Sequence, residues 1–338
     1  MAPGTDAVVL QWRPFAVALP RPLVTARGQL CERRGWVLRL RTVGGAVGWG
    51  EAAPLASAET LPAALQCTAA AIAALGASTA PLSRQALEAW MASPGCPAAL
   101  AFGLGSALAE ADGLVGPAAG GWRPAPPSAQ LLPAGAAAPA ALEAAIGAGH
   151  GATPLCFKWK VAVEADALER SLLEELLARL PVTARLRLDA NGGWSRDTAA
   201  AWAERLAADP RLQWLEQPLA PADHPGLQAL AMRVPVALDE SLDADPRLRL
   251  QWPSWQVRRP SQEGDPRPLL AALRAGRPRL VLSTAFETGI GRRWLHHLAA
   301  LQADGPTPAA PGLAPAWQPS GPLLAADPEG VWEAAACP

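Results

Sequence analysis

The stretch RLRLDANGGWSRDTAAAWAERLAADPRLQWLEQPL, residues 185–219, carries the pattern that decides the fold. A short apolar run ends in an acid at Asp189, a helical pattern follows over residues 195–209, and a second apolar run ends in an acid at Glu216. Strands that alternate with helices in this way predict a parallel sheet covered by helices.

The same unit recurs through the second half of the chain. Further apolar runs of strand length stand at residues 157–163, 235–240, 255–260 and 279–285, and further helical patterns at 166–180 and 292–303. So many units in about 180 residues favour a closed β/α barrel over an open doubly wound sheet. No GxGxxG follows the first strand, as a dinucleotide-binding sheet would require.

The first half of the chain has a different pattern. Residues 1–50 alternate as strands do, and an alanine-rich helical stretch runs from about Thr60 to Ala111. The segment 116–128 is dense in Gly and Pro and is the best linker candidate. We therefore predict an α+β capping domain over 1–125, a (β/α)-barrel domain over 126–310 and a segment returning to the cap over 311–338.

Composition excludes several classes of partner. The 338 residues carry a formal charge of −1, which argues against a nucleic acid or an anionic membrane as partner. The five cysteines form no CxxC pair and are interpreted as reduced thiols. No apolar run is long enough to span a bilayer. We therefore expect a cytoplasmic protein. The four histidines show no zinc spacing, and the adjacent His296 and His297 are expected on a helix surface.

Acids end three successive strands of the predicted barrel: Asp189, Glu216 and Asp239. The C-terminal strand ends of a β/α barrel meet at one rim, about 4.8 Å from strand to strand, so these carboxylates are expected around one centre on a solvent-accessible rim. Three anions so close need a cation, and oxygen ligands without His or Cys select Mg²⁺. Taken singly, each acid is more often a turn or helix-capping residue.

Lysine occurs at two places only, Lys158 and Lys160, among 29 basic residues. Side chains alternate along a strand, so both lie on one face, about 6.6 Å apart, on the strand before the one that ends in Asp189. They can be solvated charges on an edge strand. Arginine serves that purpose elsewhere in the chain, however, and lysine can lose its proton where arginine cannot. This favours a lysine base at the barrel mouth.

Together these motifs resemble the enolase superfamily and, within it, the o-succinylbenzoate synthase group. The resemblance is carried by FKWK, LDANGGW, WLEQPL and VALDES, with GWGEAAPLASAET (48–60) and LVLSTAFETGIG (280–291) nearer the ends. It implies a capping domain with a modified (β/α)7β barrel. It also implies one Mg²⁺ ion, with Mn²⁺ as a substitute, and a small-molecule carboxylate as substrate.

The resemblance also implies roles for individual residues. Asp189, Glu216 and Asp239 would bind the metal, Lys160 would be the base and Lys158 a supporting cation. Asn191 and Glu240 would hold the metal ligands, and the cap segment 23–30 would close over the substrate. Ser283 and Thr284 would lie near the substrate, or are ordinary hydroxyls at a strand end.

The chain departs from the family at Arg259, which stands in QVRRPSQEGD where relatives have a second lysine. Arginine is not a proton acceptor but can hold charge against a π face. Racemisation needs a titrating group on each face, whereas a syn-dehydration can use Lys160 twice. The expected activity is therefore a hydro-lyase of menaquinone or phylloquinone biosynthesis, which dehydrates 2-succinyl-6-hydroxy-2,4-cyclohexadiene-1-carboxylate to 2-succinylbenzoate. The alternatives are an N-acylamino-acid racemase or dipeptide epimerase, and a non-catalytic barrel that binds a ligand.

Overall fold

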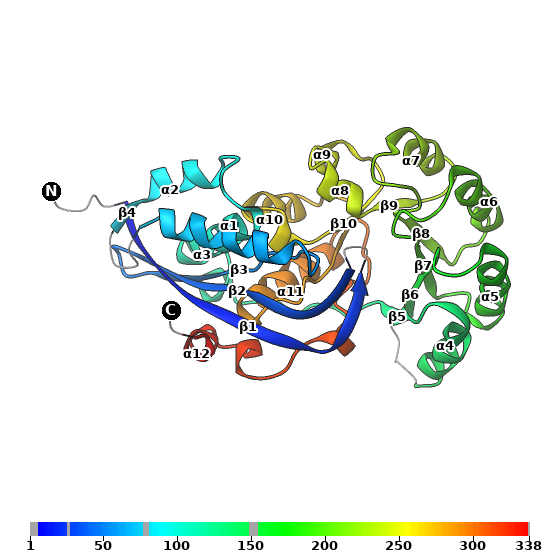
Figure 1. Ribbon diagram of the computed structural model, residues 1–338, viewed down its shortest axis with the longest axis horizontal. Coiled ribbons are helices and arrows are strands. Elements are labelled where there is room, and N and C mark those ends of the chain that lie inside the picture. Colours follow the sequence, from blue (N-terminus) through cyan, green and yellow to red (C-terminus); the bar gives the residue numbers. More distant parts are fainter. Residues whose placement is uncertain (1–5, 26–27, 77–80, 149–154, 337–338) are drawn as a thin grey trace.

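The computed structural model describes residues 6–25, 28–76, 81–148 and 155–336. Figure 1 shows an antiparallel sheet with its helices on one side and a curled parallel sheet ringed by helices on the other. These are the cap and the barrel that the sequence predicts. No helix in the described ranges is long and apolar enough to cross a membrane.

The cap is a four-stranded antiparallel sheet in the order β3-β2-β1-β4. Its elements are β1 (Ala7–Thr25), β2 (Gly28–Thr42), β3 (Val47–Ala52), α1 (Leu61–Ala74), β4 (Pro81–Ser83), α2 (Arg84–Met91) and α3 (Ala98–Ala111). Helix α3 packs closely on β3 because Gly48 and Gly50 have no side chain. A Cβ at Gly48 would stand 1.8 Å from the Ala107 carbonyl oxygen, so only glycine allows this approach.

The barrel is a parallel sheet of seven strands in the order β5 to β11. The strands are β5 (Gln130–Leu132), β6 (Cys156–Lys160), β7 (Arg185–Asp189), β8 (Leu212–Glu216), β9 (Val236–Leu238), β10 (Trp255–Arg258) and β11 (Leu280–Leu282). The helices between and after them are α4 (Ala138–Gly147), α5 (Asp166–Arg179), α6 (Arg196–Leu206), α7 (His224–Ala231), α8 (Glu240–Ala244), α9 (Leu248–Gln251), α10 (Arg267–Arg274) and α11 (Gly289–Ala303).

A short segment closes the barrel between β11 and β5. Ser283 and Gly312 form a parallel bridge, and the Gly312 amide donates to the Leu282 carbonyl at 2.8 Å. On the other side, the Ala129 amide donates to the Pro311 carbonyl at 2.9 Å. The segment therefore takes the place of an eighth strand, as the (β/α)7β architecture requires.

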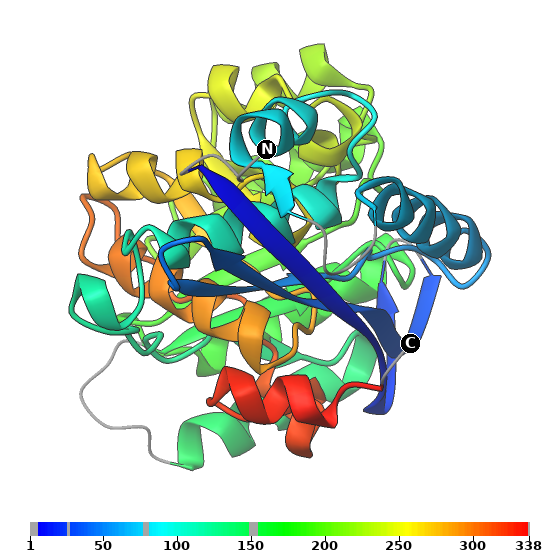
Figure 2. The same cartoon turned by 90° about the vertical axis from the view of Figure 1, so that its left-hand side faces the viewer.

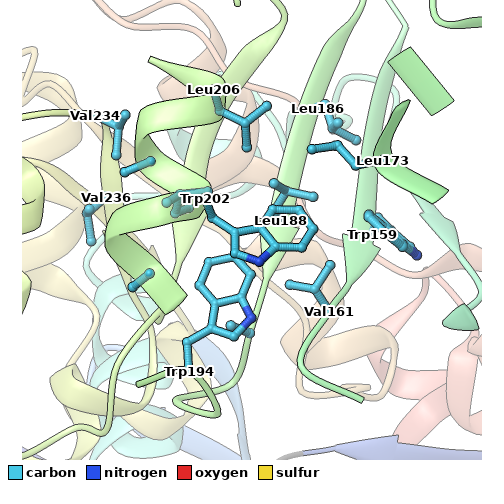
Figure 3. Packing of buried hydrophobic residues seen from close by; sticks show 14 of the residues in the cluster. Trp159, Val161, Leu173, Leu186, Leu188, Trp194, Trp202, Leu206, Val234 and Val236 are labelled. Atoms are coloured by element: carbon cyan, nitrogen blue, oxygen red, sulfur yellow. The ribbon is translucent and has the colours of Figure 1, made fainter. Parts of the chain in front are cut away.

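The strand FKWK shows why the barrel core and the pocket lie on opposite faces of one sheet. Phe157 and Trp159 have no exposed surface and pack outward under the helices. Trp159 lies near Trp202, which stacks on Trp194 with ring centroids 5.0 Å apart (Figure 3). Strand alternation then turns the two lysines of β6 to the barrel interior.

After the barrel the chain returns to the cap through η4 (Pro315–Trp317), η5 (Pro322–Leu324) and α12 (Pro328–Ala334). Figure 2 shows α12 beside the cap sheet. The Trp332 and Trp49 rings meet with centroids 5.9 Å apart, and Arg13 donates to the Trp332 carbonyl at 2.8 Å. The cap is therefore built from both ends of the chain.

The expected surface position of His297 is wrong. Only 4% of His297 is exposed, and its Nδ1 accepts from the Arg123 amide at 3.4 Å. The ring also lies edge-on to Trp122 at 5.7 Å. The Gly- and Pro-rich segment 116–128 thus packs over α11 through Trp122 and covers a face that the helical pattern alone leaves open.

Candidate functional site

A cavity of about 530 Å³ lies at the C-terminal ends of the barrel strands, below the cap. Nine of the ten predicted site residues line it: Lys158, Lys160, Asp189, Asn191, Asp239, Glu240, Arg259, Ser283 and Thr284. Glu216 lies beneath it and contacts Lys158. The structure therefore brings all ten residues together. The cap adds Arg21, Leu30 and Leu55 to the lining. Of the predicted closing segment 23–30, residues 26–27 lie outside the described residues.

Strand register explains why the charged residues meet. Lys160 of β6 pairs in register with Asp189 of β7, and Asp189 pairs with Glu216 of β8. Asp239 follows β9, the next strand along the sheet. The three acids are only 5%, 2% and 3% exposed, so the expectation of a solvent-accessible rim is wrong. The cap and the loops after the strands cover them.

Lys158 is held between two acids. Its Nζ donates to Glu216 at 2.5 Å and lies 2.8 Å from an Asp189 oxygen. Burial alone would lower the pKa of Lys158, but the charges of Asp189, Glu216 and Asp239 outweigh it and raise the pKa above its ordinary value. Lys158 is therefore a permanent cation here.

Lys160 is different. It is half-buried, it lines the cavity, and no acid within the described ranges accepts a hydrogen bond or forms an ion pair with its amine. The amine is therefore open to contact with a ligand in the cavity.

Arg259 stands on the other side of the barrel, after β10, four strands from β6 in the sheet. Its guanidinium makes a double ion pair with Asp239, with Nη2 donating to Oδ2 at 2.7 Å. Burial works to lower the pKa of Arg259, but Asp239 outweighs it and raises the pKa above its ordinary value. This residue stays charged at every working pH.

Asn191 and Glu240 bind one another beside the acids. Asn191 Nδ2 donates to Glu240 Oε1 at 3.0 Å, and the Asn191 amide donates to Asp189 at 3.1 Å. Burial, reinforced by the charges of Asp239 and Asp189, raises the pKa of Glu240 to about 7. The Asn191 oxygen Oδ1 and the second Glu240 oxygen, Oε2, are buried without a hydrogen bond within the described ranges.

Ser283 and Thr284 line the cavity, but their hydroxyls are already used within the protein. Thr284 Oγ1 donates to Glu287 at 2.7 Å and accepts from the Phe286 amide, and Ser283 donates to the Gly312 carbonyl at 3.3 Å. Both contacts fix the loop after β11. That geometry agrees with the reading of these residues as strand-end hydroxyls.

The acid cluster has the right chemistry for a hard divalent cation. Taken as they stand, no three His, Cys, Asp or Glu side chains in the described part of the chain surround a common metal position. Instead, Lys158 and Arg259 lie against the acids. However, a single ammonium touches both Asp189 and Glu216, and Asp239 is near enough to raise its pKa. Oxygen donors that already converge on a positive centre fit Mg²⁺.

Among the cavity residues that sequence reasoning missed are Arg21, Arg187 and Trp317. Arg187 is buried, and donates to Gln213 at 2.8 Å and to the Ala310 carbonyl at 2.7 Å. Its position two residues before Asp189 on an inward-facing strand was the available signal. Arg21 and Trp317 come from distant segments, and the sequence held no sign that they meet.

Comparison with known proteins gives three findings. The family model described as "Enolase C-terminal domain-like" matches residues 140–247. The o-succinylbenzoate synthase of Thermosynechococcus vestitus is 35% identical over 301 residues, which cover 85% of this chain and 87% of that protein. Among solved structures, o-succinylbenzoate synthase from Thermosynechococcus elongatus, complexed with Mg in the active site, matches with a TM-score of 0.76 and 34% identity.

That structural match covers 96% of this chain and 99% of the other. The L-Ala-D/L-Glu epimerase from Bacillus subtilis matches with a TM-score of 0.66 over 90% of this chain and 89% of its own, at 19% identity, and so shares the fold. The chain belongs to the o-succinylbenzoate synthase family of the enolase superfamily.

Proposed function

We propose that this protein catalyses the Mg²⁺-dependent syn-dehydration of 2-succinyl-6-hydroxy-2,4-cyclohexadiene-1-carboxylate to 2-succinylbenzoate, in the cytoplasm, as a step of menaquinone or phylloquinone biosynthesis. The relative that is 35% identical over most of both chains, and the solved structure that is 34% identical, carry the name of this synthase. Asp189, Asp239, both lysines and Arg259 line the cavity, and Glu216 contacts Lys158 beneath it.

The observation that carries the proposal is the contrast between Lys160 and Arg259. Lys160 has an amine without an acid partner in the described part of the chain, whereas Arg259 is locked in a double ion pair with Asp239. A reaction that needs one titrating group is therefore favoured over one that needs two on opposite faces. Dehydration on one face is such a reaction.

In this mechanism the neutral amine of Lys160 removes the proton from the ring carbon that bears the carboxylate. The electron pair of that C–H bond becomes a ring double bond as the C–O bond to the neighbouring hydroxyl breaks. The Lys160 ammonium returns its proton to the departing hydroxyl, which leaves as water. The base is thereby regenerated, and the ring becomes aromatic.

Asp189, Glu216 and Asp239 would hold Mg²⁺, or Mn²⁺ in its place. When bound, the metal supplies positive charge for the ring carboxylate and for the charge that develops on it as the proton leaves. Lys158 and Arg259 add fixed positive charge on two sides of the same cavity. Asn191 and Glu240 would orient Asp189 through their hydrogen bonds.

The proposal is tested by incubating the purified chain and Mg²⁺ with the cyclohexadiene substrate and following the absorbance of the aromatic product. We expect turnover that EDTA abolishes and added Mg²⁺ restores. A parallel incubation with an N-acylamino acid tests the racemase. Turnover of the amino acid without dehydration of the diene would reject the proposal in favour of that reaction.

A further inference from the structure

One cation of the cavity comes from the cap. Arg21 of β1 lines the cavity, and its guanidinium carbon lies 3.9 Å from the centre of the Trp317 ring. Trp317 lines the same cavity and belongs to η4, in the segment that returns from the barrel to the cap. Two segments almost 300 residues apart in the chain thus meet at one side of the cavity.

The local backbone explains why Arg21 leaves the cap sheet. Proline on both sides, Pro20 and Pro22, supplies no amide hydrogen for strand pairing and fixes the backbone angle φ. The β1–β2 register accordingly breaks here, with residues 19–22 opposite Cys31 alone. A bulge of this kind redirects a side chain, and the two prolines make its backbone rigid.

Two features of Trp317 suit it to bind an anion: its ring is fixed by apolar packing, and its indole N–H has no acceptor among the described residues. Its ring packs against the apolar cluster that contains Leu19, Leu30 and Phe286. The indole Nε1 is buried and has no hydrogen-bond acceptor among the described residues. An unsatisfied buried donor is costly, and an anionic oxygen brought by a ligand would satisfy it.

Within the described ranges, Arg21 differs from the other two arginines of the cavity in that no acid or carbonyl accepts a hydrogen bond from its guanidinium. Arg259 is paired with Asp239, and Arg187 is buried against Gln213, a backbone carbonyl and the Trp214 ring. Arg21 is exposed, and within the described ranges it stacks on Trp317 without an ion pair. Stacking on the ring face leaves the N–H groups at the guanidinium edge available for a carboxylate.

We propose that Arg21 and Trp317 form the subsite for a second carboxylate of the substrate, at the end away from the ring carboxylate beside Lys160. This inference rests on the proposed function, in which the substrate ends in a succinyl carboxylate. The guanidinium edge of Arg21 and the indole N–H of Trp317 donate to that group. The two residues thereby make a dicarboxylate bind better than a monocarboxylate of the same shape.

The test uses two ligands of nearly equal shape, each titrated by calorimetry into the full chain with Mg²⁺. 2-Succinylbenzoate carries both carboxylates, and 2-butanoylbenzoate ends in a methyl group where the second carboxylate stands. We expect Arg21→Gln to weaken the binding of 2-succinylbenzoate about 10- to 30-fold, the range for a partly exposed charge-assisted hydrogen bond. The binding of 2-butanoylbenzoate should weaken much less. Arg21→Lys should restore part of the affinity, and Trp317→Phe, which keeps the ring but removes the donor, should show a smaller loss in the same direction.

Arg41→Gln is the matched control, because Arg41 is an exposed arginine of the same cap sheet that does not line this cavity. Steady-state kinetics on the diene adds a second readout: Arg21→Gln should raise KM more than it lowers kcat. The inference is overturned if Arg21→Gln weakens the binding of both ligands equally. It is also overturned if Arg21→Gln has the same ligand affinities as Arg41→Gln while the wild type binds 2-succinylbenzoate and dehydrates the diene. If the wild type neither binds 2-succinylbenzoate nor dehydrates the diene, the proposed function fails as well.

Discussion

At the scale of single residues, Lys158 and Lys160 leave the same face of β6 but have different neighbours. Lys158 lies between Asp189 and Glu216, and those acids raise its pKa above the ordinary value despite its burial. Lys160 lies two residues further along the strand, where no acid of the described ranges forms an ion pair with its amine. The sequence predicted a lysine base on this strand, and the contacts now favour the second lysine.

The assignment of Lys160 is tested by Lys160→Arg, which keeps a positive charge and removes the amine that is proposed as the base. We expect kcat for the diene to fall by more than the roughly 10²–10⁴ of a single acid–base group, because one amine serves both proton transfers. Mg²⁺ affinity and thermal unfolding, measured on the same sample, should stay near the wild-type values. A loss below about tenfold with an unchanged pH profile would contradict the assignment.

The acid cluster is best tested with amides, because Asp189, Glu216 and Asp239 are buried against cations. Alanine would remove one of the two acid partners of Lys158, or the ion pair of Arg259, and destabilise the fold. Glu216→Gln keeps the shape and removes the charge, so calorimetry should show Mg²⁺ binding weakened on the order of 100-fold or more. The control is Glu204→Gln, an exposed glutamate on α6. Equal Mg²⁺ affinity in the two variants would reject the metal site.

At the scale of elements, a buried glutamate fixes the turn that follows the lysine strand. Glu169 of α5 is 1% exposed and accepts from the amides of Ala162, Val163 and Glu164, at 2.8, 2.9 and 3.0 Å. The turn needs this support because Ala162 has φ +61°, a conformation unfavourable for alanine. This contact sets where β6 ends, and with it the position of Lys160.

We predict that Glu169→Gln lowers the free energy of unfolding by about 2–3 kcal/mol. The NH₂ group of the glutamine would face a backbone N–H group at a place where a carboxylate oxygen now accepts a hydrogen bond. Urea titration measures this loss. Glu175→Gln, on the exposed face of the same helix, should change the stability by less than about 0.5 kcal/mol. If Glu169→Gln and Glu175→Gln both lowered the free energy of unfolding by the same small amount, the turn would not depend on the buried carboxylate.

The elements also show what a sequence pattern can and cannot predict. Strands β6 to β11 were predicted because each is an apolar run that ends in polar residues, and three of these ends supplied the acid cluster. Strand β5 and the closing segment around Gly312 were missed. Each is short, lies among prolines and alanines, and pairs only because the barrel brings partners to it.

At the scale of the whole molecule, a buried polar contact joins cap to barrel. Glu51 of β3 accepts from the Thr288 amide and hydroxyl at the start of α11, at 2.7 and 2.5 Å. Burial, followed by repulsion from Glu287, raises the pKa of Glu51 to about 7 from 4.5, although Thr288 and Arg33 oppose the shift. The pattern GWGEAAP marked this place in the sequence, but its partner in α11 could only be found in three dimensions.

This raised pKa predicts a pH dependence of stability. Between about pH 4.5 and 7 the folded chain keeps a proton on Glu51 that the unfolded chain releases, so the contribution of this group to stability falls as pH rises through that window. Glu51→Gln cannot ionise. The free energy of unfolding of the variant, relative to the wild type, should therefore improve by roughly 2 kcal/mol from pH 5 to pH 8. Glu59→Gln, a substitution at an exposed position of the same domain, should show no such trend with pH. If the difference in free energy of unfolding between Glu51→Gln and the wild type did not change with pH, the raised pKa would be contradicted.

The site as a whole was predictable where it depends on strand ends and not where it depends on docking of the cap. Asp189, Glu216, Asp239 and the lysines follow from the barrel rule that strand ends share a rim. The burial of the acids does not follow from it, nor does the meeting of Arg21 with Trp317. Both depend on how the two ends of the chain cover the barrel, and no local pattern encodes that.

The central claim is that proton transfer occurs on one face, through Lys160, with Arg259 as a fixed charge. The most direct test is to incubate the wild type and Mg²⁺ in D₂O with one enantiomer of an N-acylamino acid, and to follow α-deuterium by mass spectrometry and configuration by chiral chromatography. A single base permits exchange with retention, so we predict that any deuterium enters without the opposite enantiomer appearing. Formation of the opposite enantiomer at a rate comparable with exchange would mean that a second group on the Arg259 side transfers a proton, and the claim would be wrong.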